Sequence, residues 1–347
     1  MSCEIHEFGS LSPNLDGKSV LVTGGTGSFG HGFVEAVLAR YRPRRLIVFS
    51  RDELKQSEMA QRFPQSRYRA MRYFIGDVRD HDRLEMAMRD VDIVIHAAAL
   101  KQVPTAEYNP FECINTNVMG AEHVVRAAIR SGVDRVVALS TDKAANPINL
   151  YGASKLASDK IFVAANNLSG RKGARFAVVR YGNVIGSRGS VIPLFRKLAG
   201  EKADHLPITD PRMTRFWITL RQGVDFVLSS LEMMAGGEIF VPKIPSMRIV
   251  DVAEALAPGV AHRSLRSGRR PYKLHEVLIT QDDARNTIEI PDRYVITPAF
   301  DDRVLKRYIK AGGNRTAEEF CYASDTNTAW LDGSTLRQMC TELQTAA

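Results

Sequence analysis

A tyrosine and a lysine near the middle of the chain have the types and spacing needed to take a proton from a hydroxyl group. Tyr151 and Lys155 are four residues apart at the start of an expected helix (151–167), so their side chains share one face of it. A nearby ammonium group favours tyrosinate and lowers the pKa of the tyrosine, which can then accept a hydroxyl proton near neutral pH. Thr141, just after an expected strand, can hydrogen-bond the same substrate oxygen. Hydride leaving the same carbon for a nicotinamide would complete an oxidation.

A glycine-rich turn near the N-terminus predicts the binding site for such a cofactor. Gly24, Gly27 and Gly30 form G-x-x-G-x-x-G between an expected strand (19–23) and an expected helix (33–41). The first glycine allows the tight turn, the second lets backbone N–H groups approach a pyrophosphate, and the third lets helix and strand pack closely. The helix N-terminus adds a partial positive charge for the phosphates. The same loop adds the predicted cofactor contacts Thr26, Ser28 and Phe29.

The end of the second expected strand (46–49) predicts NADP rather than NAD. NAD sites usually place a carboxylate there for the ribose hydroxyls, whereas this chain has Ser50 and Arg51, with Lys55 one helical turn later. A guanidinium group binds a phosphate dianion through two parallel hydrogen bonds. A surface arginine paired with Asp52 or Glu53 is the alternative interpretation of Arg51. The remaining predicted cofactor contacts are Asp77, Val78, Ala97, Ala98, Ala99, Lys101 and Asn117, together with Tyr151 and Lys155.

The elements that must position these residues alternate along the first half of the chain. Further short apolar runs are at 72–75, 93–95, 136–139 and 176–179, and amphipathic stretches are at 53–62, 80–88, 110–129 and 151–167. This alternation predicts an α/β protein with a Rossmann-type, doubly wound parallel sheet. We expect a flexible N-terminal extension (1–16), an NADP-binding domain (17–185) with a returning strand near 238–242, a smaller and mostly substrate-binding lobe (186–330), and a C-terminal tail (331–347).

Composition excludes several other classes of protein. The 347 residues are 44% hydrophobic and carry a net charge of +8. The basic residues are scattered, which favours a multiply charged phosphate ligand over nucleic acid. No metal-type spacing relates Cys3, Cys113, Cys321 and Cys340, so no metal site is predicted. The absence of a signal peptide and of a membrane-spanning apolar run predicts a cytoplasmic protein that does not bind membranes.

The stretch from Ser140 to Lys155, in this Rossmann frame, resembles the extended short-chain dehydrogenase/reductase family. In that family, sugar-nucleotide epimerases usually have small residues after the threonine, whereas sugar 4,6-dehydratases have an acid and a base there. Asp142-Lys143 resembles the variant found in the inverting UDP-N-acetylglucosamine 4,6-dehydratases, which open the pseudaminic acid pathway. The resemblance extends from about residue 17 over nearly the whole chain, through SRDELKQ (50–56), MRYFIGDVRD (71–80), AEYNP (106–110), RYGNVIGSRGSVIP (180–193), LPITDPRMTRFWI (206–218), GGEIFVPKIPSM (236–247) and KLHE (273–276).

This resemblance implies a dehydration with internal hydride return. Oxidation at C4 of the sugar acidifies the C5 proton, water leaves across C5 and C6, and the hydride returns to C6. Tyr151 would handle the C4 hydroxyl proton, with Lys155 tuning it and holding the nicotinamide ribose. Asp142 would be the acid at the C6 oxygen and Lys143 the base at C5, with a pKa lowered by Lys155 and the nicotinamide cation. From the residues alone, Lys143 could equally be solvent-exposed or paired with Asp142.

The resemblance also indicates the substrate and the residues that bind it. We expect UDP-N-acetylglucosamine as substrate and a homo-oligomer as the assembly. Predicted substrate contacts are Lys101, Asn183, Arg188, Arg215, Lys243, Met247, Arg269 and Glu276. The chain departs from the family at Gln102, where histidine is usual, and at Pro271-Tyr272, where glycine and glutamate are usual. Proline fixes φ and removes a hydrogen-bond donor, so we expect nucleotide affinity or specificity to differ.

Other functions fit the same frame less well. A UDP-sugar 4-epimerase, another UDP-sugar oxidoreductase or a retaining UDP-sugar dehydratase are the enzymatic alternatives, and Asp142-Lys143 argues against an epimerase. An NADP-binding regulator is the non-enzymatic alternative, but such proteins commonly lose the tyrosine or the lysine that this chain keeps. The sequence leaves open whether the product serves flagellin glycosylation or a surface polysaccharide.

Overall fold

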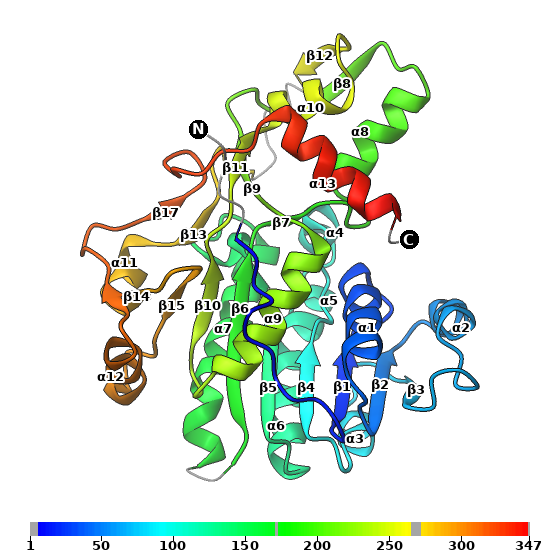
Figure 1. The fold of residues 1–347 in the computed structure, drawn as a ribbon, viewed down its shortest axis with the longest axis vertical. Helices are drawn as coiled ribbons and strands as arrows, with labels where there is room; N and C mark the ends of the chain where they lie inside the picture. The colour runs from blue at the N-terminus through cyan, green and yellow to red at the C-terminus, as the bar shows by residue number, and fades with distance from the viewer. Residues whose placement is uncertain (1–5, 171–172, 265–271, 346–347) are drawn as a thin grey trace.

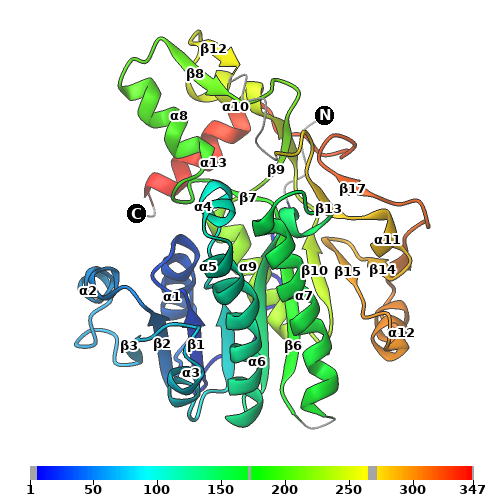
Figure 2. The same cartoon turned by 180° about the vertical axis from the view of Figure 1, so that it is seen from behind.

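The alternating apolar runs of the first half form a parallel sheet. In a computed structural model of the protein, which describes residues 6–170, 173–264 and 272–345, a ten-stranded sheet has the order β16-β14-β15-β10-β6-β5-β4-β1-β2-β3. Its parallel part consists of β1 (Ser19–Thr23), β2 (Arg45–Ser50), β3 (Met71–Ile75), β4 (Ile93–His96), β5 (Arg135–Thr141), β6 (Arg175–Tyr181) and β10 (Ile239–Pro242). Apart from β3 at the edge of the sheet, these strands are almost wholly buried because helices cover both faces of the sheet (Figures 1 and 2).

The helices divide between the two faces of this sheet. Helices α1 (Ser28–Arg40) and α9 (Leu220–Met233) pack together on one face, whereas α3 (His81–Ala87), α6 (Gly120–Arg130) and α7 (Leu150–Ser169) lie on the other (Figures 1 and 2). The helix expected at 110–129 is interrupted, because α5 (Pro110–Ile114) is followed by a π-helical turn at Asn115–Met119 before α6 begins. The remaining helices of this domain are α2 (Glu53–Arg62), α4 (Val103–Tyr108), α11 (Gln281–Ala284) and α12 (Asp302–Lys310).

A second lobe with its own core lies beyond the carboxyl ends of the parallel strands (Figure 1). Phe195, Trp217 and Leu336 are among its fully buried residues. It is built from β7 (Asn183–Val184), α8 (Val191–Gly200), β8 (His205–Ile208), β9 (Thr214–Ile218), β11 (Ser246–Arg248), α10 (Ile249–Leu256), β12 (Ala261–Ser264) and α13 (Gly333–Thr345).

The boundaries of this lobe differ from the expected ones. Residues 277–323 return to the main domain: β14 (Thr287–Glu289), β15 (Arg293–Ile296) and β16 (Asn314–Arg315) extend the large sheet, and β13 (Val277–Ile279) pairs with β17 (Tyr322–Ala323). The segment expected as a tail contains α13, which packs on α10 with Leu336 and Cys340 fully buried. Apolar residues at helical spacing give this segment a face that must be covered.

The N-terminal segment is packed rather than flexible over its described part, residues 6–16. Phe8 and Leu15 are buried. The ring of Phe8 meets the ring of Phe226 in α9 edge-on, with centroids 4.8 Å apart. Gln222, also in α9, donates to the backbone oxygen of His6 at 3.2 Å. The sequence prediction failed here because a single aromatic residue in a polar segment gives no periodic signal.

Among the described residues, every helix is too short or too polar to span a bilayer.

Replacing Phe8 by alanine tests whether the N-terminal segment contributes to folding. The Phe8→Ala variant loses a fully buried aromatic side chain, so the free energy of unfolding in urea should fall by about 3 kcal/mol. The control is Phe300→Ala, since Phe300 is 55% exposed, and its effect should stay below about 0.5 kcal/mol. Equal effects of the two changes would contradict the packed arrangement.

Candidate active site

The glycine turn after β1 has the backbone geometry that a bound diphosphate requires. Gly24 has a φ of +63°, and a Cβ atom there would lie 2.8 Å from the backbone of Ala98. A Cβ atom on Gly30 would lie 2.0 Å from the backbone oxygen of Gly25. Both positions therefore exclude any side chain. Gly27 caps α1 without a side-chain hydrogen bond, so the first N–H groups of this helix point into the loop.

A cavity of about 230 Å³ opens beside this turn, across the ends of β1, β2 and β4. Its lining includes the predicted cofactor residues Gly24, Thr26, Ser50, Arg51, Lys55, Asp77, Val78, Ala98 and Ala99. Leu100 and Thr116 also line it and were not predicted. The hydroxyl groups of Thr26 and Ser50 are 2.9 Å apart and join the first two strand ends.

The two basic side chains at this cavity, Arg51 and Lys55, each lie near a carboxylate. Lys55 lies 2.7 Å from Asp52, and Arg51 lies 3.6 Å from Asp77. The sequence suggested Asp52 or Glu53 as the partner of Arg51, whereas the observed partner is Asp77. Although burial opposes it, hydrogen bonds from Arg79 and the charge of Arg51 lower the pKa of Asp77. The guanidinium of Arg51 remains 55% exposed, so it can still reach a ligand in the cavity.

Two predicted cofactor residues hold loops in place rather than line the cavity. Asn117, in the π-helical turn, accepts from the backbone N–H of Leu100 at 2.8 Å and donates to its carbonyl at 2.9 Å and to Ser154 in α7 at 2.9 Å. Lys101 donates to the carbonyl of Arg188 at 3.0 Å. Asn117 thus fixes the loop after β4 against the helix that carries the tyrosine, and Lys101 connects that loop to the second lobe. Of the other predicted residues, Ala97 precedes the lining residue Ala98 along the chain. Gly27, Ser28, Phe29 and Gly30 are not among the residues that line this cavity.

The end of β5 and the start of α7 bring the tyrosine to the threonine. A short 3₁₀ turn (Asp142–Ala144) follows β5, and Asn149 then caps α7 by accepting from the N–H of Gly152 at 2.9 Å. A Cβ atom on Gly152 would lie 2.3 Å from the carbonyl oxygen of Lys143, so glycine lets the helix start pack against the turn. As a result Thr141 lies close enough to Tyr151 to lower the pKa of the phenol, while its own hydroxyl donates to Asp142 Oδ1 at 2.9 Å.

The electrostatics of Tyr151 differ from the expected tuning by Lys155. Burial raises the pKa of Tyr151 to about 12, and the charge of Lys143 is the main factor that lowers it. Lys155 instead donates to the carbonyl of Leu139 at 2.7 Å, and burial lowers its own pKa. Lys155 is thus not among the main causes of the Tyr151 shift, and its tuning of the tyrosine stays a prediction.

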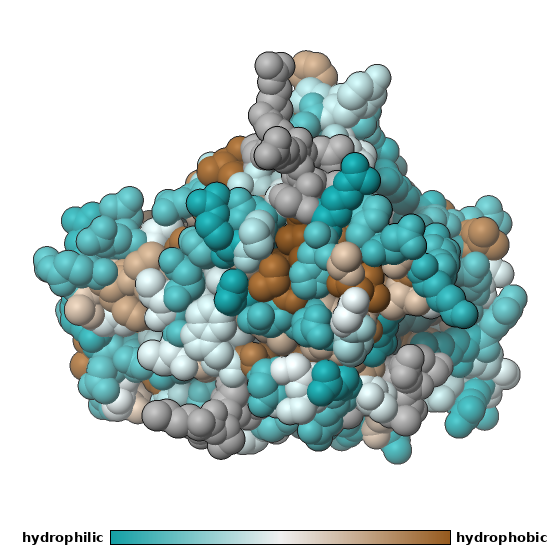
Figure 3. Space-filling view, turned by 90° about the horizontal axis from the view of Figure 1, so that it is seen from above, coloured by the Kyte–Doolittle hydropathy of each residue, from teal (hydrophilic) through white to brown (hydrophobic). Residues whose placement is uncertain are grey.

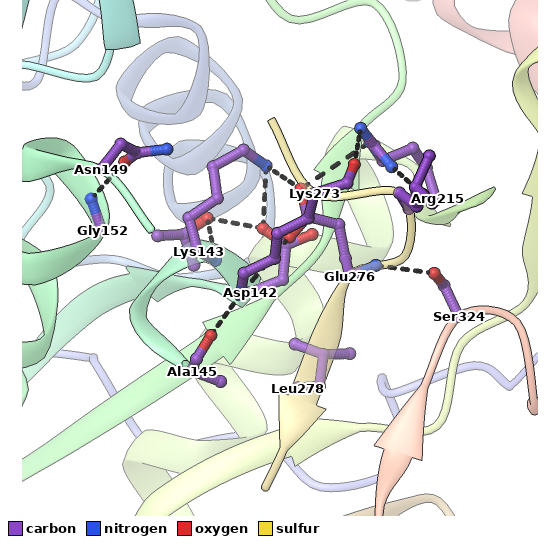
Figure 4. A network of polar contacts seen from close by, with 12 residues as sticks. Asp142, Lys143, Ala145, Asn149, Gly152, Arg215, Lys273, Glu276, Leu278 and Ser324 are labelled. Atoms are coloured by element: carbon purple, nitrogen blue, oxygen red, sulfur yellow. Dashed lines mark hydrogen bonds and ion pairs between the residues drawn. The ribbon is translucent and has the colours of Figure 1, made fainter. Parts of the chain in front are cut away.

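A cluster of charged residues surrounds the ammonium of Lys143 (Figure 4), and the charges of Lys143 and Asp142 act on Tyr151. The ammonium of Lys143 is 3.0 Å from Asp142 Oδ1 and 3.3 Å from Glu276 Oε1. Asp142 and Glu276 are at most 3% exposed. Arg215 Nε and Lys273 Nζ lie 3.7 and 4.0 Å from the two oxygens of Glu276. Among the described residues, neither Asp142 Oδ2 nor Glu276 Oε2 has a hydrogen-bond partner.

The cluster sets the charge state of its members. Burial raises the pKa of Asp142, Lys143 lowers it, and Glu276 raises it further, so the shift is upward. Although burial opposes it, Asp142 and Glu276 raise the pKa of Lys143. Burial also opposes the shift of Glu276, whose pKa is lowered by Lys143, Arg215 and Lys273. The expected lowering of the Lys143 pKa was wrong, because two carboxylates contact its ammonium. Of the two interpretations left open for Lys143, the pairing with Asp142 is the one observed.

The predicted substrate residues divide into three groups. Arg215 and Glu276 belong to the cluster, and Arg215 also donates to the carbonyls of Leu274 and Lys273. Asn183, in β7, is partly exposed, whereas Arg188 is exposed and its carbonyl accepts from Lys101 in the loop after β4. Lys243 pairs with Glu289 at 2.7 Å and Met247 is buried in the core of the second lobe, whereas Arg269 lies outside the described residues.

The two departures from the family pattern lie close to the site. A Cβ atom on Gly189 would lie 2.6 Å from the amide nitrogen of Gln102, so Gln102 faces the loop that contains Arg188. Tyr272 packs against both the second-lobe core and the small apolar cluster that contains Tyr151. Pro271 lies outside the described residues. Lys273 was not predicted as a site residue, although its spacing of three from Glu276 in KLHE could have indicated it.

A parallel sheet with a glycine turn after its first strand, and a Thr-Tyr-Lys set after β5, defines an extended short-chain dehydrogenase/reductase. Residues 20–298 match the model of a family described as polysaccharide biosynthesis protein. The chain therefore belongs to the polysaccharide biosynthesis protein family.

Two named relatives are similar to this chain over nearly its full length. A UDP-N-acetylglucosamine 4,6-dehydratase (inverting) from Campylobacter jejuni is 55% identical over 329 residues, which are 93% of this chain and 97% of the relative. A UDP-glucose 4-epimerase from Rickettsia bellii is 40% identical over 337 residues, 94% of this chain and 96% of the relative. The resemblance to the inverting dehydratases that the motifs indicate is thereby confirmed.

Solved structures agree on the fold. Pen from Bacillus thuringiensis superimposes with a TM-score of 0.85 at 33% identity, covering 95% of this chain and all of that one. The dTDP-glucose 4,6-dehydratase DesIV from Streptomyces venezuelae, with NAD and TYD bound, gives a TM-score of 0.62 at 25% identity and covers 73% of this chain and 86% of that one. The predicted α/β, Rossmann-type fold is confirmed.

Replacing Lys143 by methionine tests the charge balance of the cluster. The Lys143→Met variant leaves two buried carboxylates without their shared ammonium, so it should lower the free energy of unfolding at pH 7 by about 3 kcal/mol. The difference from the unchanged protein should shrink as the pH falls below the ordinary Glu value of 4.5. Protonation then relieves the unpaired carboxylates of the variant, whereas the unchanged protein loses the contribution of its lowered Glu276 pKa.

The matched control removes a lysine of similar exposure whose partner carboxylate is exposed rather than buried. Glu289, the partner of Lys243, is 45% exposed, so Lys243→Met should cost less than about 1 kcal/mol. Urea unfolding of both variants between pH 4 and pH 8 makes the comparison. A difference for Lys143→Met that grows on acidification would contradict the assigned charges.

Proposed function

We propose that the protein is an NADP-dependent UDP-N-acetylglucosamine 4,6-dehydratase that inverts C5. The observation that carries the proposal is the 3.0 Å pair of Lys143 with the buried Asp142, whose charges act on the neighbouring Tyr151. Oxidation at C4 requires the tyrosine and threonine, and elimination across C5 and C6 requires a further acid and base. The name of the Campylobacter jejuni relative supports this assignment.

The residues at the glycine turn fit a nicotinamide dinucleotide. Gly24 and Gly30 occupy positions from which neighbouring backbone atoms exclude any Cβ, and the adjoining cavity lies beside the open N–H groups of α1. Arg51 and Lys55 at the end of β2 favour the 2′-phosphate of NADP. A nicotinamide dinucleotide held by these residues would supply the hydride acceptor for C4 of the sugar and the hydride donor for C6.

The chain's own residues supply the proton transfers. Thr141 holds the C4 oxygen and Tyr151 takes its proton, with the charge of Lys143 aiding release of the tyrosine proton. The resulting ketone acidifies the C5 proton. Asp142, whose pKa is raised by burial and by Glu276, gives its proton to the leaving C6 oxygen. Lys143 takes the C5 proton as the free amine, after its ammonium has first passed a proton to the carboxylate of Glu276, 3.3 Å away.

Substrate binding involves the second lobe. A UDP-sugar carries a diphosphate, for which guanidinium and ammonium groups are suitable partners. Arg215, Lys101 and Arg188 lie on the loops and strands that face the active site from this lobe or from the loop after β4. Asn183 and Glu276 complete the proposed set. Lys243, held by Glu289, and Met247, in the core of the lobe, would act only by supporting the site.

An epimerase is the second candidate, because the Rickettsia bellii relative is named a UDP-glucose 4-epimerase. Epimerisation at C4 needs no acid or base at C5 and C6, so it gives the cluster around Lys143 no role. A retaining dehydratase would use the same elimination without inversion. A regulator would not need the Tyr151–Lys155 pair. The cytoplasmic location, the homo-oligomeric assembly and the pathway served by the product stay predictions.

Incubation with UDP-N-acetylglucosamine and no added reductant tests the proposed reaction. NMR of the product should identify a UDP-2-acetamido-2,6-dideoxy-L-arabino-hexos-4-ulose, because the hydride taken from C4 is returned to C6. The Lys143→Ala variant should form it at a rate lower by at least about 100-fold. A UDP-N-acetylgalactosamine product would assign the protein as an epimerase, and a D-xylo product would make it a retaining dehydratase.

Replacing Arg51 by alanine tests the preference for NADP. A charged hydrogen bond to the 2′-phosphate contributes about 1.5 to 3 kcal/mol, so Arg51→Ala should weaken NADPH binding by about 10- to 100-fold. NADH binding should change less than threefold, by fluorescence titration of both nucleotides. Arg126→Ala, which removes a half-exposed arginine of α6, is the control for net charge. Equal losses for NADPH and NADH would contradict recognition of the 2′-phosphate.

A further inference from the structure

Inversion of the configuration at C5 requires more than one proton-transfer group. A proton leaves one face of the sugar carbon and another proton arrives on the opposite face, so two proton-transfer groups are needed. Lys143 supplies the first, next to Asp142, because the C5 proton and the C6 oxygen leave together. The structure holds a second amine in the same cluster, Lys273, whose side chain is 12% exposed.

Lys273 reaches the cluster from the segment that precedes β13. Its ammonium donates to the carbonyl of Ala145, one residue beyond the 3₁₀ turn that carries Asp142 and Lys143. It also lies 4.0 Å from Glu276 Oε2, whereas Lys143 lies 3.3 Å from Glu276 Oε1. One carboxylate therefore contacts both amines through different oxygens (Figure 4). Among the described residues, Glu276 Oε2 accepts no hydrogen bond and is free to take a proton.

We infer that Lys273 is the second proton-transfer group at C5 and that Glu276 carries protons between Lys273 and Lys143. This inference rests on the proposed dehydratase function. It assigns one lysine to each face of the sugar ring, and it assigns Glu276 to proton relay rather than to substrate binding.

The proton balance of this scheme closes within the site. Lys143, as the free amine, takes the C5 proton while Asp142 gives its proton to the departing C6 oxygen, and water leaves. Lys273, as the ammonium, then gives a proton to the opposite face of C5 as C6 gains its hydride. Lys143 ends with one proton more and Lys273 with one fewer, and Glu276 passes a proton from the first to the second. The proton that Tyr151 takes from the C4 hydroxyl balances the one that Asp142 loses.

The surroundings of the two amines suit opposite roles. Burial lowers the pKa of Lys273, and of the charged groups that face it, Glu276 and Asp142 raise this pKa whereas Lys143 and Arg215 lower it. Its proton is therefore released more readily than that of Lys143, whose pKa is raised. A proton moving from Lys273 to the sugar, and from the sugar to Lys143, goes to the stronger base.

The test uses the full-length protein with Lys273 replaced by arginine. Lys273→Arg keeps the positive charge and a donor for the Ala145 carbonyl, but a guanidinium does not release its proton. Three readouts follow the reaction with UDP-N-acetylglucosamine: absorbance of reduced nicotinamide at 340 nm in a single turnover, deuterium uptake at C5 from D₂O, and the C5 configuration of the product by NMR. Lys197→Gln, in α8, is the control because Lys197 is 71% exposed and pairs only with Glu201 among the described residues.

We expect Lys273→Arg to reduce the nicotinamide within about threefold of the normal rate and to form inverted product about 100-fold more slowly, with the D-xylo epimer appearing. Glu276→Gln should likewise reduce the nicotinamide at a nearly normal rate and form inverted product slowly. Urea unfolding checks that each variant is folded. Inverted product at the normal rate from Lys273→Arg would overturn the inference, as would equal losses in all three readouts, which indicate a binding or structural role. The unchanged protein separates the two proposals, since failure to form any 4-keto-6-deoxy sugar would refute the dehydratase assignment itself.

Discussion

The ammonium of Lys143, held between the buried carboxylates of Asp142 and Glu276, is the interaction on which the site depends. Two carboxylates in a water-excluded pocket are strongly unfavourable unless cations compensate them. Asp142 belongs to the turn after β5, whereas Glu276 precedes β13 and is joined to Ser324 through its backbone N–H. The ion pairs therefore hold the Rossmann sheet and the segment that leads out of the second lobe at a fixed separation.

The same cluster explains how few residue types can supply several proton transfers. Asp142 is buried beside a second carboxylate and tends to keep its proton, whereas Glu276 faces three cations and tends to lose it. Lys143 and Lys273 are shifted in opposite directions for the corresponding reason. Environment, rather than residue type, thus separates acids from bases. The Thr141–Tyr151 pair adjoins this cluster, so oxidation and elimination can follow each other at one bound sugar.

The local parts of this arrangement could be predicted from sequence, and the long-range parts could not. Continuous apolar runs predicted β1 to β6, and the glycine spacing predicted a turn whose positions Gly24 and Gly30 admit no side chain. The protonation of Lys143 depends on Glu276, far along the chain, and neighbouring residues suggested the opposite shift. The packing of Phe8 on α9 and of α13 on α10 likewise depends on distant residues, which the hydrophobic periodicity of a segment does not identify.

The central claim is that oxidation at C4 and reduction at C6 occur within one pocket on the same sugar. UDP-N-acetylglucosamine labelled with deuterium at C4 tests it directly, with the position of the label in the product determined by NMR and mass spectrometry. The account predicts that the deuterium moves to C6 of the same molecule, with no crossover when labelled and unlabelled substrates are mixed. Deuterium that returns to C4, or that is lost from the sugar, would contradict it.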